Sequence, residues 1–126
     1  VPVEWEQSSF DAIKNLSNLC VVVVETGGNG GRDLDDAAFS GRFNRNVRDS
    51  DAIIVGAGSS ADHAPLFYTS RGSRVDLQGY GENVVTTGYG NLFNVEGVNR
   101  RYTHTFNGTS SASPIVATGF RCLRGS

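Results

Sequence analysis

The sequence is poor in cysteine, in net charge and in long apolar runs, and each scarcity excludes a class of protein. Two cysteines are too few for a disulfide scaffold. A net charge of −2 argues against a surface for nucleic acid or for an anionic membrane. No apolar run approaches the ~20 residues of a membrane span. An initial methionine and a signal-peptide pattern are also absent, so the sequence carries no direct information on export.

What the sequence does contain is typical of a globular, loop-rich chain. It has 126 residues with 16 glycines, and 38% of the residues are hydrophobic and 19% are charged. This length suits one domain or part of one. Cys20 and Cys122 are expected to be buried thiols, because unbridged cysteine is among the most buried residue types. Neither is expected to be catalytic, since nothing around them would stabilise a thiolate.

The apolar pattern predicts an α/β fold. Between residues 8 and 19, apolar side chains recur at three-residue steps, which predicts a helix with one apolar stripe. Residues 20–24 and 52–58 are continuous apolar runs, as in strands buried on both faces of a parallel sheet. The prediction is part of a doubly wound, mostly parallel sheet with flanking helices. Short strands over residues 82–87 and 102–106 are expected to flank a polar loop.

The most informative stretch is N-G-T-S-S-A-S-P at residues 107–114, which is followed by an apolar run. It is typical of a tight loop that turns into a helix: Gly108 permits unusual backbone geometry, and Ser110 is an N-cap candidate. Pro114 is tolerable only in or near the first helical turn. A serine held there meets free backbone N–H groups and the positive end of the helix dipole, which suits a nucleophile. The plain alternative is a polar cap on a buried helix.

This stretch resembles the nucleophile motif of the subtilisin-like serine proteases (subtilases), G-T-S-x-A-S-P. By that resemblance Ser110 is the nucleophile. A second run, V-V-V-V-E-T-G-G-N at residues 21–29, is similar to the strand that ends in a Gly-Asn pair in this family. The resemblance makes Asn29 the oxyanion-hole donor, together with the backbone N–H of Ser110. Loss of one such donor costs about 10²–10³ in rate, a magnitude established on subtilisin itself.

The resemblance also implies a peptide or protein substrate and the residues that contact it. Phe106 is expected to line the leaving-group side of the cleft. One wall of the pocket for the residue preceding the cleaved bond would be formed by Glu25, Thr26, Gly27 and Gly28.

The catalytic aspartate and histidine of the family usually lie in D-x-G and H-G-T motifs. Neither motif occurs in this sequence, and no histidine precedes Asn29. Residues 1–126 therefore resemble the carboxyl-terminal portion of a subtilase catalytic domain, a single incomplete domain. We expect the missing amino-terminal part to be its partner, and the chain alone to be inactive or nearly so. His63 and His104 are the histidines present, and a loop or surface role is the plain alternative to a base.

Other functions stay open. One is a non-catalytic subtilase-like module for binding or regulation that kept the nucleophile loop by descent. Another is an α/β hydrolase or esterase, which is weakened because residues 108–112 end in alanine instead of completing G-x-S-x-G.

No cofactor and no metal site are assigned. The acidic residues 33–36 are a candidate for calcium, which many subtilases carry, but they lack the ligand alternation of an EF-hand loop. A solvated acidic loop is the expectation. Secretion is implied by the family alone.

Overall fold

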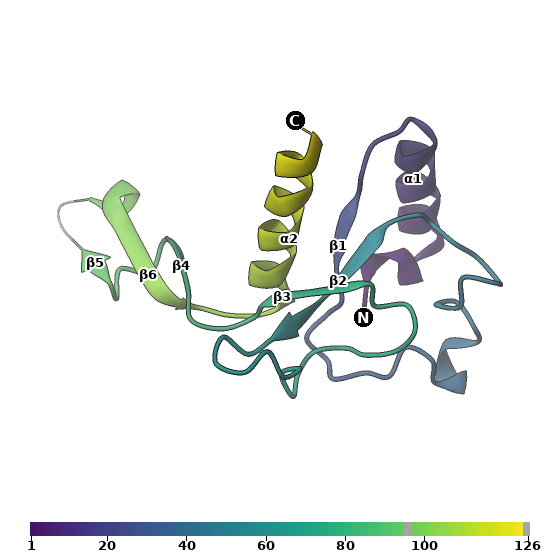
Figure 1. Ribbon diagram of the computed structural model, residues 1–126, viewed down its shortest axis with the longest axis horizontal. Helices are drawn as coiled ribbons and strands as arrows, with labels where there is room; N and C mark the ends of the chain where they lie inside the picture. The colour runs from purple at the N-terminus through teal and green to yellow at the C-terminus, as the bar shows by residue number, and fades with distance from the viewer. Residues whose placement is uncertain (95–96, 125–126) are drawn as a thin grey trace.

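Three parallel strands form the centre of the computed structural model, which describes residues 1–94 and 97–124 (Figure 1). They are β1 (Val24–Thr26), β2 (Ile53–Gly58) and β3 (Leu77–Tyr80), in the order β1-β2-β3. Because the strands are parallel, their carboxyl ends meet at one edge of the sheet, where sites in α/β folds form. The strand predicted over residues 52–58 is confirmed as β2, which is almost wholly buried.

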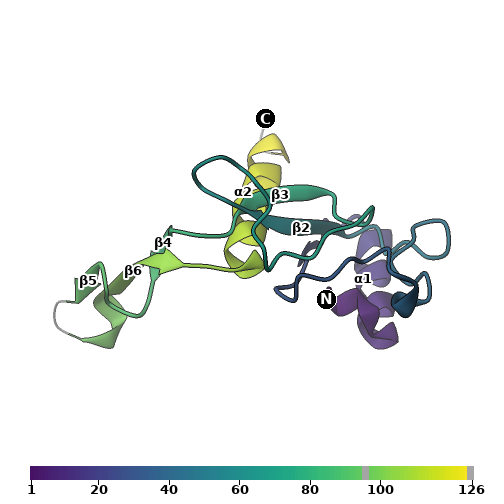
Figure 2. The same ribbon diagram turned by 90° about the horizontal axis from the view of Figure 1, so that it is seen from below.

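Two helices flank this sheet: β1 lies between them in Figure 1, and Figure 2 shows β2 between them. They are α1 (Gln7–Asn18), which confirms the predicted helix, and α2 (Thr109–Arg124). A side chain at Gly79 of β3 would place its Cβ 2.6 Å from the carbonyl oxygen of Ala112, so glycine is what lets α2 approach this strand. Within the described ranges, no helix is long and apolar enough to cross a membrane.

The strand predicted over residues 20–24 is wrong in its extent and burial. The ladder begins only at Val24, and Val21 and Val22 are 44% and 41% exposed. The physical reason is that β1 is an edge strand of the sheet, so one side of it has no neighbouring strand. The expected burial of Cys20 and Cys122 is also wrong, since both are exposed. Cys20 lies in the turn before β1 with a φ of 60°.

A buried ionic network joins the amino-terminal segment to the sheet. Arg74, 1% exposed, donates from Nε and Nη2 to the two carboxylate oxygens of Glu4, at 2.9 and 3.0 Å. The Ser50 hydroxyl donates to the same carboxylate, and Arg74 also donates to the Ala52 carbonyl and to Asp76. The network therefore ties the short helix η1 (Val3–Trp5) to the start of β2. Apolar residues complete the core: Ile13, Leu34, Phe43, Ala52, Ile54, Val55, Ala57 and Ala112.

A second, antiparallel sheet projects from this body on the far side of α2 from β1 (Figure 1). Its strands are β4 (Val84–Thr87), β5 (Phe93–Asn94) and β6 (Arg101–Phe106), in the order β4-β6-β5. We call residues 84–94 and 97–106 the arm. The predicted flanking strands are confirmed as β4 and β6, whereas β5 and β3 were not predicted. The arm exposes many large apolar side chains: Val85, Tyr89, Leu92, Phe93, Val98 and Tyr102.

Candidate active site

The exposed side chain of Ser110 stands at the amino-terminal end of α2. The helix begins at Thr109, so Ser110 lies in the first turn and is not the N-cap residue that the sequence predicted. The turn before it depends on Gly108, whose φ of 105° is unfavourable for any other residue. Pro114 lies inside α2, where it has no N–H to give the carbonyl of Ser110. No hydrogen bond engages the Ser110 hydroxyl within residues 1–94 and 97–124.

The neighbouring serines are buried and serve the structure. Ser111 Oγ contacts the carbonyl oxygens of Gly108 and Tyr80 at 2.8 and 3.0 Å, and Ser113 Oγ donates to that of Thr109 at 3.0 Å. These buried hydroxyls therefore bond to backbone oxygens of the loop, of β3 and of the first turn of α2. Of the three serines, only Ser110 offers its hydroxyl to solvent.

Asn29 meets the nucleophile loop across 80 residues of sequence. Its Oδ1 accepts from both the backbone N–H and the hydroxyl of Thr109, each at 2.8 Å. Because only the oxygen of an amide can accept from an N–H, these two bonds fix the orientation of the side chain. Asn29 Nδ2 then lies beside Gly108, where a Cβ would come within 3.1 Å of it. In the described part of the chain, Nδ2 has no acceptor.

Two donors without acceptors among the described residues therefore lie at the loop that carries the exposed hydroxyl. One is Asn29 Nδ2, and the other is the backbone N–H of Ser110, which has no acceptor among the described residues. Backbone donors of a first helical turn carry the positive end of the helix dipole. Neutral donors fixed beside a nucleophile are suited to stabilise a negative oxygen that forms during attack.

Tyr68 supports the loop that carries Ser110 through hydrogen bonds, a role that sequence reasoning missed. Its hydroxyl accepts from the backbone N–H of Gly108 at 3.1 Å and donates to the carbonyl of Gly81. The Gly108 N–H also donates to the Gly81 carbonyl at 2.8 Å. An aromatic residue in a polar loop offers no sequence signal for such a bridge, because its partners are backbone atoms 13 and 40 residues away.

The predicted substrate wall follows β1 at the edge of the sheet. Thr26 is half-buried, whereas Gly27 is buried and donates its N–H to the carbonyl of Val55 at 2.8 Å. Gly28 has a φ of 88° and abuts the backbone of Val1. These positions directly precede Asn29 in the chain, and their contact with substrate stays a prediction.

Glu25, the fourth residue of that wall, turns toward the amino-terminal segment. It is 6% exposed, and its Oε1 accepts the backbone N–H of Glu4 at 2.9 Å. Its Oε2 is buried without a partner in the described ranges. Burial raises the pKa of the Glu25 carboxyl to about 7; the Glu4 carboxylate adds to the rise and backbone N–H groups oppose it. A neutral carboxyl suits this buried position.

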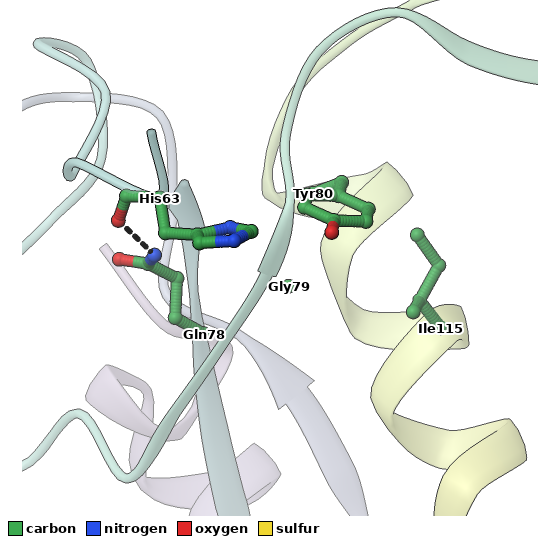
Figure 3. Close-up of a pocket in the computed structure, with 5 residues that line it drawn as sticks. All are labelled: His63, Gln78, Gly79, Tyr80 and Ile115. Carbon is green, nitrogen blue, oxygen red and sulfur yellow. Dashed lines mark hydrogen bonds between the residues drawn. The ribbon is translucent and has the colours of Figure 1, made fainter. Parts of the chain in front are cut away.

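Neither histidine is hydrogen-bonded to Ser110 in the part of the chain that the structure describes. The His63 ring stacks on Tyr80 with centroids 5.6 Å apart, and both line a cavity of about 330 Å³ with Ile115 of α2 (Figure 3). The exposed His104 is on β6, where its backbone N–H donates to the Asn91 side chain at 3.3 Å. A positioned general base is therefore not among the described contacts of Ser110.

The carboxylates of residues 35 and 36 in the acidic run 33–36 accept hydrogen bonds from other residues of the chain. Asp35 accepts from the N–H and hydroxyl of Ser73, at 2.8 and 2.6 Å, and these bonds hold the pKa of Asp35 below its usual value. Asp36 accepts the N–H of Ala38 at 2.8 Å. Within the described residues, no group of three or more His, Cys, Asp or Glu side chains could hold a metal ion.

Phe106 lies at the base of the arm, next to the nucleophile loop. It is half-buried and lines two pockets. One, of about 230 Å³, separates β4 from α2. The other, of about 290 Å³, is shared with Tyr89, Thr105 and Asn107.

Comparison with known proteins agrees with this fold. The sequence model of the subtilase family, Peptidase S8, matches residues 2–124. A solved structure described as a lanthipeptide protease is similar in fold, with a TM-score of 0.61 and 20% sequence identity. The similarity covers 88% of this chain but 39% of that protease. Comparison with curated proteins gives no match.

Proposed function

The chain belongs to the subtilase family, and from that premise we propose that it supplies the nucleophile and the oxyanion hole of a serine endopeptidase. The observation that carries the proposal is the pair of hydrogen bonds from Thr109 to Asn29 Oδ1. They hold the Asn29 amide beside the loop of an exposed serine and leave Asn29 Nδ2 without an acceptor among the described residues.

In the proposed reaction, Ser110 Oγ attacks the carbonyl carbon of a peptide bond while a histidine from outside these 126 residues takes its proton. Negative charge develops on the carbonyl oxygen, which accepts hydrogen bonds from Asn29 Nδ2 and the Ser110 N–H. When the carbonyl re-forms, the C–N bond breaks and the leaving amine takes the proton. Water then releases the acyl group from Ser110 by the reverse sequence.

We assign the missing amino-terminal part of the catalytic domain to the free side of β1. That side presents an apolar groove of about 360 Å³ between β1 and α2, with Val22, Ala117 and Phe120 among its lining. An edge strand offers unpaired backbone groups to a further strand, and apolar cover would bury the exposed valines. If this is the contact, Val22→Lys lowers the affinity between the two parts, which is measurable by titrating one against the other.

Labelling with a fluorophosphonate tests the proposed nucleophile. The full-length protein is labelled, its intact mass is compared with that of the 126 residues, and the modified peptide is mapped. We expect stoichiometric labelling at Ser110, abolished by Ser110→Ala and retained by Ser113→Ala, which removes a buried hydroxyl. A folded full-length protein that stays unlabelled would contradict the proposal.

The second candidate function is a non-catalytic module of the same family. It is favoured by one observation, that neither imidazole bonds to Ser110 within the described residues. Such a module would bind peptide without reacting with the fluorophosphonate. Binding without labelling or hydrolysis therefore identifies it, whereas activity on small esters but not on peptides would point to an esterase.

A further inference from the structure

Tyr89 occupies a strained position in the turn that leaves β4. Its φ is 53°, and it stands between two residues that also have positive φ, Gly88 at 110° and Gly90 at 88°. Outside glycine, asparagine and aspartate, a left-handed backbone is uncommon and energetically unfavourable. The turn is held against β6, because the Gly88 N–H donates to the Arg101 carbonyl at 2.8 Å. Strain of this kind persists where the surrounding structure holds it in place.

The strained turn presents an aromatic ring to solvent. Tyr89 is 78% exposed, and it lines the pocket of about 290 Å³ together with Thr105, Phe106 and Asn107. An uncovered ring beside a second aromatic residue can bury a large apolar area when a ligand enters between them. Tyr89 thus forms one wall of an open pocket, and most of its own surface is exposed to solvent.

This pocket adjoins the candidate nucleophile. Asn107 lies three residues before Ser110, a stretch of chain that spans at most about 11 Å. An extended peptide advances ~3.3 Å per residue, so the pocket is within reach of the second or third residue from the attacked bond. The arm also leaves the body on the opposite side of α2 from β1, where the predicted wall for the preceding residue lies (Figure 1). A peptide bound along that wall and past Ser110 would therefore place the residues after its cleaved bond against the arm.

We propose that Tyr89 is a specificity-determining residue of this site, which binds an apolar or aromatic side chain at the second or third residue after the cleaved bond. The inference rests on the proposed function, since it takes Ser110 as the point of attack. The occupant is a segment of polypeptide substrate, and its side chain packs between the rings of Tyr89 and Phe106.

The test measures peptide binding in the full-length protein with Ser110→Ala, so that cleavage does not interfere. Two fluorescent peptides differ only in having Phe or Ser at the second and third residues after the intended bond. Tyr89→Asn removes the ring but tolerates the left-handed backbone. We expect it to weaken binding of the Phe peptide roughly 3- to 10-fold while leaving the Ser peptide unchanged. Tyr89→Phe keeps the ring and should keep the preference.

Phe93→Leu is the matched control, because it alters an exposed aromatic residue of the arm that does not line the pocket. It should leave the ratio of the two affinities as in the parent protein. An unchanged ratio in Tyr89→Asn, or an equal loss in Phe93→Leu, would overturn the inference. Labelling at Ser110 reports the proposed function separately, so a site that binds by this rule but never reacts would refute the protease and not the role of Tyr89.

Discussion

The body of this molecule (the parallel sheet with its helices) and the arm differ in how their residues are held together. In the body, residues far apart in sequence are joined through buried polar contacts, as Glu4 is to Arg74 and Asn29 is to Thr109. In the arm, β4 and β6 pair with each other, and large apolar side chains remain exposed. The difference is consistent with the proposed function, in which the body holds Ser110 and Asn29 in place and the arm presents an exposed apolar surface.

Breaking the buried network should produce the largest loss of stability. Arg74→Leu leaves the Glu4 carboxylate buried without its cation, which costs about 3–5 kcal/mol of unfolding free energy. Urea denaturation measures this loss. The double variant with Glu4→Leu should recover most of it, because removing both charges is far less costly than removing one. A small effect of Arg74→Leu alone would show that the body does not depend on this pair.

The stability of the body should also depend on pH through Glu25. Its pKa is about 7 when folded, against 4.5 as the ordinary value, so the folded state favours the protonated carboxyl. The stabilisation is complete below pH 4.5 and is lost as the pH rises through 7; at 1.36 kcal/mol per pKa unit it amounts to on the order of 3 kcal/mol.

Glu25→Gln mimics the protonated form, so it should remove this part of the pH dependence. Unfolding free energies of the two proteins at several pH values between 4 and 8 provide the comparison. If both curves have the same slope, the Glu25 carboxyl is ionised in the folded protein.

The smallest effect is expected in the arm. Val98 is 69% exposed, so Val98→Ser should change the unfolding free energy by no more than about 0.5 kcal/mol. The measurement is the same urea denaturation, with Ile54→Ala as the contrasting variant, because Ile54 of β2 is fully buried. That substitution should cost about 2–5 kcal/mol. Equal losses would erase the distinction between the two regions.

Sequence reasoning succeeded where the information is local. The periodicity of α1, the buried run of β2 and the two strands of the arm follow from patterns a few residues long. The meeting of Asn29 with the loop of Ser110 was expected through two short motifs that resemble the same family. Their assignment to catalysis stays a proposal, although the structure brings the two residues together.

It failed where a side chain finds its partner only in the folded chain. Nothing near Arg74 marks it for burial, because Glu4 is 70 residues away. The apolar run before β1 was predicted to be buried, but strand pairing and not composition decides which strand lies at the edge. The role proposed for Tyr89 could not be predicted either, because it depends on a left-handed turn and on a pocket lined by residues of another strand.

The most direct test of the central claim is the labelling rate at Ser110 when Asn29 is replaced. The Asn29→Ala and Asn91→Ala variants of the full-length protein are treated with a fluorophosphonate, and the second-order rate constants are measured. Asn91 is the control because its amide serves only the arm. We expect Asn29→Ala to react about 10²–10³ times more slowly than the parent protein, and Asn91→Ala to react within about twofold of it. Equal rates in all three proteins would contradict the claim that residues 29 and 110 form one site.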